Sequence, residues 1–282
     1  MKATTDRGIS AQYLGTVALF LVGGGLIASA GYFGFIPQDT RFMMKVGVAA
    51  VSLAAWLALR RNEHLQSYRQ LALAFLSIAL GLLLAQYFGN IPMNLLGFST
   101  FTVQGVAMAK FGEAVPIVLS ILALHFATGG NANGLFLGAG NLKLGLIVGV
   151  IGLAAFAGIG ALQASGTGVS GATVVAALPW IAIFIFSNAF MEELWFRALF
   201  LKKLEPLVGA KTTLVITSLV FAVLHINATY VFDILVFLVE LMAFALLWGW
   251  LMRKTNGIWG SVLIHAGGDL LIILGFLAGA QL

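Results

Sequence analysis

Two adjacent carboxylates and a guanidinium stand near the end of a long apolar run, at Glu192, Glu193 and Arg197. Charged side chains are rare inside membrane segments because an unpaired charge is costly there, so such a group indicates a functional site. On a helix, Glu193 and Arg197 lie four residues apart on one face and can form an ion pair. Glu192 points about 100° away, stays outside that pair, and is the better candidate for a general base. Asn188, one turn earlier on the same face, is expected to orient Glu192.

Two later segments carry groups that can take part in the same chemistry. Phe221 precedes His225 by one helical turn, and His265 precedes Asp269 by one turn, with two glycines between them that permit close approach of a helix or a substrate. Counted from the nearest basic residue of the expected cytoplasmic loops, at about 1.5 Å per residue, Glu192 lies about 15 Å deep, His265 about 16 Å and His225 about 21 Å. This similar depth predicts one site inside the helix bundle.

The other ionisable residues in or near the apolar segments are not predicted to be catalytic. His125, beside a Gly- and Asn-rich loop, is expected to form a structural hydrogen bond, and His64 is expected to lie in a loop. Asp233 and Glu240 lie seven residues apart on one helix face, either as structural partners or as the lining of a water-filled approach.

The composition predicts an all-α polytopic membrane protein. Of 282 residues, 61% are hydrophobic and only 9% are charged, and the mean hydropathy is +1.03, whereas about a quarter of the residues of a soluble domain are charged. There is no cysteine, which excludes disulfides and thiolate chemistry. The net charge of +5 comes from basic residues in short loops, which indicates membrane topology and lipid contacts rather than binding of nucleic acid.

Apolar runs of about 20 residues, each long enough to cross a bilayer, recur along the chain. We predict about nine spans, with eight as the alternative, at 12–35, 43–59, 70–89, 112–128, 143–162, 172–200, 212–228, 232–252 and 258–280. The first is too long for a signal-peptide core and is expected to be an uncleaved span. The stretch 90–110, broken by Pro92 and Gly97, is expected to be a loop, an interfacial helix or a re-entrant segment.

Basic residues predict the orientation of the chain. With a cytoplasmic N-terminus, the outside loops keep only Arg41, Lys45 and Lys110, and the other basic residues of the loops collect inside. The C-terminus is then outside, which requires an odd number of spans. Together with the basic loops, the absence of a targeting segment favours a prokaryotic plasma membrane.

The chain is expected to form a single membrane domain, 1–282. Spans before residue 170 carry few ionisable groups, whereas nearly every span after it carries one or more. We therefore predict scaffold or gating helices over 1–170 and a catalytic core over 171–282.

The three segments resemble the signature of the CPBP family, also called the Abi family, which contains CAAX proteases and bacteriocin-processing enzymes. That signature is Glu-Glu-x-x-x-Arg, then Phe-x-x-x-His, then His-x-x-x-Asn or Asp, on successive membrane helices. The chain has the corresponding residues in the same order: Glu192, Glu193 and Arg197, then Phe221 and His225, then His265 and Asp269. The resemblance covers roughly residues 172–280.

The resemblance implies an intramembrane endopeptidase that acts on a peptide or membrane protein, with or without an attached lipid. It implies that Glu192 and His225 activate water, that His265 and residue 269 stabilise the oxyanion, and that Arg197 holds Glu193. Because an ionised Asp269 cannot donate a hydrogen bond to an oxyanion, it is expected to be protonated, to orient His265 or to ligate a metal.

Three alternatives to this reading stay open at the level of sequence. Glu192, His225 and His265 would suit zinc with an open water position. However, the chain has no His-Glu-x-x-His helix, and we expect a glutamate-dependent hydrolase without a cofactor. Buried Glu and His residues would also suit a proton-coupled transporter, although no internal repeat supports one. A non-catalytic peptide-binding or immunity protein could carry the same residues.

Overall fold

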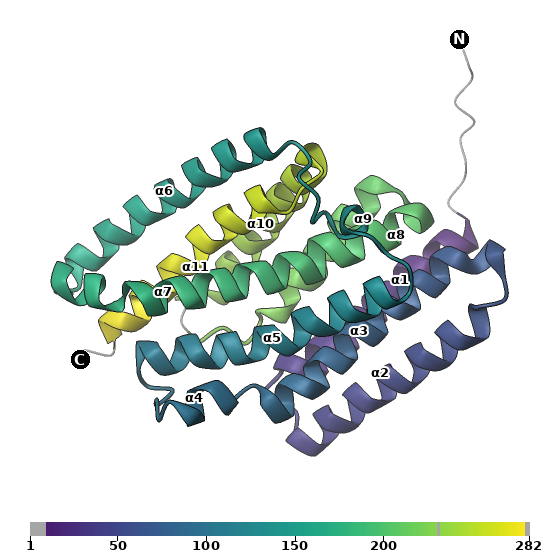
Figure 1. Cartoon of the computed structure of the whole chain (residues 1–282), viewed down its shortest axis with the longest axis horizontal. Coiled ribbons are helices and arrows are strands. Elements are labelled where there is room, and N and C mark those ends of the chain that lie inside the picture. The colour runs from purple at the N-terminus through teal and green to yellow at the C-terminus, as the bar shows by residue number, and fades with distance from the viewer. Residues whose placement is uncertain (1–9, 230–231, 280–282) are drawn as a thin grey trace, which may run out of the picture.

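The structure is a computed structural model that describes residues 10–229 and 232–279. Over these residues the chain is a bundle of helices without strands (Figure 1). Eight helical segments of the described chain are long and apolar enough to cross a membrane. A further apolar helix, α9 (Ala210–Leu224), has only 15 residues and is shorter than the span predicted at 212–228. The polytopic all-α membrane fold is confirmed.

The remaining elements are, in chain order, α1 (Ala11–Tyr32), α2 (Gln38–Leu59), the 3-10 turn η1 (Glu63–Leu65), α3 (Gln66–Phe88), α4 (Ile91–Leu95), α5 (Val103–Ala127), the 3-10 turn η2 (Ala132–Leu135), α6 (Leu142–Gly166), α7 (Gly171–Glu192), the π-helix η3 (Glu193–Phe200), α8 (Leu201–Val208), α10 (Ile234–Thr255) and α11 (Trp259–Gly279). Side chains of Thr102, Ser170 and Asp233 accept backbone N–H groups in the first turns of α5, α7 and α10. Such caps fix where each helix begins, so Asp233 has a structural role.

Of the three alternatives given for the stretch 90–110, the structure rules out a loop without helices. The stretch contains α4 and the first two turns of α5, which begins at Val103 rather than at residue 112 because Thr102 caps it there. Lys110 therefore lies in a helix and not in an outside loop. Arg41 and Lys45 likewise lie within α2, and Lys45 is buried.

Close packing of α6 along α11 positions the last part of the predicted site. A Cβ atom added at Gly260 would lie 2.7 Å from the carbonyl oxygen of Gly145, and one added at Gly267 would lie 3.0 Å from the Phe156 side chain. Only glycine permits helices to approach this closely. Ser261 also donates to the carbonyl oxygen of Trp248 at 2.8 Å, which joins α11 to α10.

The helices run up and down through the bundle, so that α1 begins at one end and α11 ends at the other (Figure 1). The start of α9 lies near the start of α1, because the hydroxyl groups of Tyr13 and Thr212 form a hydrogen bond. It also lies near the end of α10, because Arg253 donates to the carbonyl oxygen of Ala210. At its other end, Asn227 donates to the carbonyl oxygen of Tyr32 at the end of α1. Although α9 is short, it thus runs alongside its neighbours, and its C-terminal end places His225 at the predicted site.

Candidate active site

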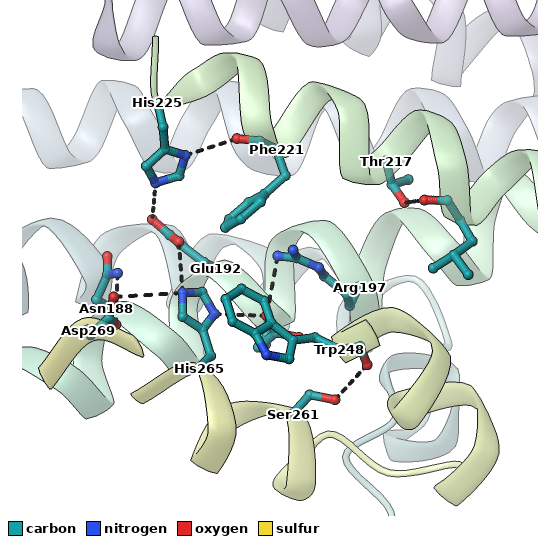
Figure 2. Close-up of polar contacts among 12 residues, drawn as sticks. Asn188, Glu192, Arg197, Thr217, Phe221, His225, Trp248, Ser261, His265 and Asp269 are labelled. Carbon is teal, nitrogen blue, oxygen red and sulfur yellow. Dashed lines mark hydrogen bonds and ion pairs between the residues drawn. The ribbon is translucent and has the colours of Figure 1, made fainter. Parts of the chain in front are cut away.

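The end of α7, the end of α9 and the middle of α11 meet at Glu192 (Figure 2). Its Oε1 lies 4.0 Å from Nε2 of His225, and its Oε2 lies 3.4 Å from Nε2 of His265. Asp269 follows on the same face of α11, with Oδ1 3.8 Å from Nε2 of His265. The three segments that were predicted to share a depth are in contact.

Glu193 and Arg197 form a fully buried ion pair at 3.2 Å, as their spacing predicts. The guanidinium also lies 3.8 Å from the ring centroid of Phe221, a cation–π contact. Glu193 has a second partner that the sequence did not reveal, because its Oε1 lies 2.9 Å from Nδ1 of His265. Glu193 and Arg197 both lie in the π-helix η3; such wider turns are often found at functional sites. Glu193 is therefore occupied by two partners, and Glu192 is the carboxylate that faces both histidines.

The backbone of Phe221 determines how His225 is presented. His225 follows the last residue of α9, and its Nδ1 lies 2.9 Å from the carbonyl oxygen of Phe221. A carbonyl oxygen only accepts, so Nδ1 carries a proton. When the ring is neutral, Nε2 then directs its lone pair toward Glu192.

Trp248 of α10 fixes the ring of His265. The two rings are stacked with centroids 4.2 Å apart and an interplanar angle of 12°. Phe221 contacts the same imidazole edge-on, at 5.8 Å. With Nδ1 directed at Glu193, the imidazole has one orientation, and Nε2 points to Glu192 and Asp269. No motif in the sequence marks Trp248 for this role, since it lies in an otherwise ordinary apolar helix.

Asn188 contacts a different carboxylate from the one expected. Its Nδ2 donates to Oδ2 of Asp269 at 3.0 Å, and no hydrogen bond to Glu192 is present among the described residues. The expectation that Asn188 orients Glu192 is therefore wrong. One helical turn places Asn188 near Glu192 in sequence, but the close approach of α11 brings Asp269 within reach of its amide.

A cavity of about 600 Å³ opens onto this group of side chains. Its lining contains Asn188, Glu192, His225 and Asp269 together with apolar side chains. Tyr32 and Lys110 from the N-terminal half also line it. Sequence reasoning missed both; for Lys110 the signal was present, because Lys110 and Glu113 are spaced to pair on one helix face and do so at 2.6 Å.

A smaller cavity of about 330 Å³ lies on the other side of His225 and Asp269, between α6, α10 and α11. Glu240 lines it, which fits one of the two alternatives given for this residue, the lining of an approach to the site. By contrast, His125 has the structural role predicted for it, since its Nε2 lies 2.9 Å from the carbonyl oxygen of Asn131. His64 lies in the short turn η1 between α2 and α3.

The candidate zinc ligands are Glu192, His225 and His265. Nδ1 of each histidine is engaged by the protein, and Nε2 of each faces Glu192. Across residues 10–229 and 232–279, no set of three or more His, Asp or Glu side chains has the arrangement of a metal site. The donor set present is suited to moving a proton between a carboxylate and two imidazoles.

Comparison with known protein families assigns this region. Residues 174–271 match the family described as Type II CAAX prenyl endopeptidase Rce1-like, and this range contains all six predicted site residues. Searches of curated proteins and of solved structures gave no match. A protease family implies a peptide or protein substrate. This region is thus similar to the CAAX protease-like family of intramembrane endopeptidases.

Proposed function

We propose that the chain hydrolyses a peptide bond with a water molecule held between Glu192 and His225. The observation that carries this proposal is the 4.0 Å separation of Glu192 Oε1 and His225 Nε2. A carboxylate oxygen and a ring nitrogen with a lone pair both accept hydrogen bonds, so a donor is needed between them. Water has two protons and reaches both acceptors at ordinary hydrogen-bond lengths of about 2.8 Å.

In this reaction Glu192 is the general base. It removes one proton from the water as the oxygen attacks the carbonyl carbon of the substrate, and it later returns that proton to the leaving amine. His225 accepts the second hydrogen bond and orients the water. Because Glu193 is already paired with Arg197 and His265, it is not free to take this proton and instead positions the site.

His265 is the proposed donor to the oxyanion. With Nδ1 donating to Glu193, a protonated imidazole presents Nε2–H at the face where Glu192 lies. Asp269 accepts from Asn188 and lies beside the same Nε2, which supports orientation of His265 rather than direct donation to the substrate. A single oxyanion donor is worth about 10²–10³ in kcat in other hydrolases.

The test is cleavage of a peptide library by the detergent-purified protein. We expect Glu192→Gln and His225→Ala to lower kcat/KM by about 10²–10⁴, the usual contribution of general acid–base catalysis. Asp233→Asn is the matched control, because it also replaces a carboxylate with an amide, and asparagine retains the helix cap. Cleavage that survived both Glu192→Gln and His225→Ala would refute these roles.

The same assay addresses metal dependence and the substrate. We propose that hydrolysis needs no cofactor, so activity is expected to persist in protein that has been treated with a chelator and contains no metal by elemental analysis. Loss of activity on chelation, with recovery on adding Zn²⁺, would assign a metal to Glu192, His225 and His265 instead.

Comparing peptides with and without an attached lipid then determines whether a lipid is required.

A further inference from the structure

A second polar cavity adjoins the candidate active site at Lys110. It has a volume of about 600 Å³ and lies among the end of α1, the start of α2, the end of α3 and the first half of α5. Val106, Lys110 and Phe184 line both this cavity and the one that contains Glu192. The two cavities therefore share part of their wall.

The lining of this cavity has an excess of positive charge. It contains Arg41, Lys45 and Lys110 but only one carboxylate, Glu113, which pairs with Lys110 at 2.6 Å. Among the residues described, neither Arg41 nor Lys45 has a carboxylate within 4.0 Å. An uncompensated charge inside a membrane protein is costly, and such groups commonly face a ligand or pair with an anion.

The partners of the two remaining cations are incomplete. Lys45 is only 7% exposed, and its Nζ donates to Oε1 of Gln86 at 2.7 Å, which satisfies a hydrogen bond but not a charge. Nε of Arg41 is buried and has no hydrogen-bond partner in the structure. Two cations on one helix, one of them held by a neutral amide and the other with an unused donor, are suited to binding an anion.

We propose that this cavity is an anion subsite that receives a carboxylate of the peptide substrate while the scissile bond lies against Glu192. This inference rests on the proposed function. Glu192 and Asp269 disfavour a carboxylate next to the scissile bond, whereas Arg41 and Lys45 favour one in the adjoining cavity. The carboxylate can be that of an acidic side chain or that of the peptide C-terminus.

The experiment measures binding to the Glu192→Gln protein, which does not depend on turnover. Two pairs of peptides are compared: one pair has a free or an amidated C-terminus, and the other has Asp or Asn on the C-terminal side of the cleavage position. We expect one acidic peptide to bind at least about tenfold more tightly than its neutral partner, as expected for loss of a charge-assisted contact. Which pair shows the preference identifies the source of the carboxylate.

Substitutions then locate the preference. Lys45→Met and Arg41→Met, each added to Glu192→Gln, are expected to reduce the ratio of the two dissociation constants toward one. Lys203→Met is the matched control, because Lys203 also donates to a glutamine, Gln70, at 2.9 Å, on a helix away from this cavity. Equal binding of both peptides in every pair would overturn the proposal. So would a preference that both Lys45→Met and Arg41→Met leave intact. Neither result would bear on Glu192 as the base, which the hydrolysis assay tests separately.

Discussion

The hydrogen bond between Asn188 and Asp269 is the residue-level contact that joins α7 to α11 in the candidate site. An amide on α7 donates to a carboxylate on α11 at 3.0 Å, and Asp269 then lies beside His265. We predict that Asn188→Asp lowers kcat/KM by about 10- to 100-fold, because two buried carboxylates at this distance repel each other and cannot both ionise.

The exchanged double variant tests the cause of that loss. Asn188→Asp combined with Asp269→Asn restores one amide and one carboxylate and is expected to recover most of the activity. Values of kcat/KM for one peptide, measured for both singles and the double, form a complete cycle. A double variant as impaired as Asn188→Asp alone would show that the pair does not position His265.

The contact between α6 and α11 is the feature at the level of helices that places His265 and Asp269. Gly260 lies against the backbone of Gly145, so even a methyl group must move one of the two helices. Gly260→Ala is expected to destabilise the protein by about 1–3 kcal/mol, the usual cost of overpacking, and to reduce hydrolysis by displacing His265.

Gly158→Ala on α6 is the matched control, because nothing lies within 4 Å of the added Cβ atom. It should be neutral or slightly stabilising, since alanine favours a helix over glycine by about 1 kcal/mol. Thermal unfolding and peptide hydrolysis, measured on both variants in the same detergent, check this. Equal stability and activity of the two variants would show that close packing of α6 on α11 is not needed.

The orientation of the whole molecule in the membrane is a prediction from its basic residues and its connectivity. Phe35 precedes α2 and Arg61 follows it, so the two residues lie at opposite ends of this helix. The chain contains no cysteine. Single-cysteine variants therefore have no background reaction. With a cytoplasmic N-terminus, Phe35→Cys should react in intact cells with a thiol reagent that does not cross membranes.

Arg61→Cys should react only after the cells are permeabilised. The reverse pattern would mean that the N-terminus is outside, and reaction of both variants in intact cells would mean that α2 does not span the membrane. Arg41, Lys45 and Lys110, the basic residues that were assigned to the outside loops, lie within helices. Removing them from the outside loops increases the asymmetry of basic loops on which this prediction rests.

The division of the chain into scaffold and catalytic halves stays a prediction, and the structure adds a complication to it. Tyr32 and Lys110 come from the N-terminal half, yet both line the cavity that contains Glu192. The anion-subsite experiment measures whether residues of the N-terminal half bind the substrate in addition to supporting the catalytic half.

The sequence by itself determined the fold class and the candidate residues. Long apolar runs can only be membrane helices, because backbone groups in lipid must be satisfied within the segment. The spacing of four residues places Glu193 with Arg197, and His265 with Asp269, on common helix faces, and a count of residues along each helix placed Glu192, His225 and His265 at similar depth.

Only the tertiary structure decided which partner each polar group has. The contacts of Glu193 with His265, of Trp248 with His265 and of Asn188 with Asp269 join residues far apart in the chain. Helical periodicity gives the face on which a residue lies but not the helix that packs against that face. Which helix packs against that face depends on how closely the helices can approach each other. The glycines of α6 and α11 permit a close approach only when the two helices face each other in the folded protein.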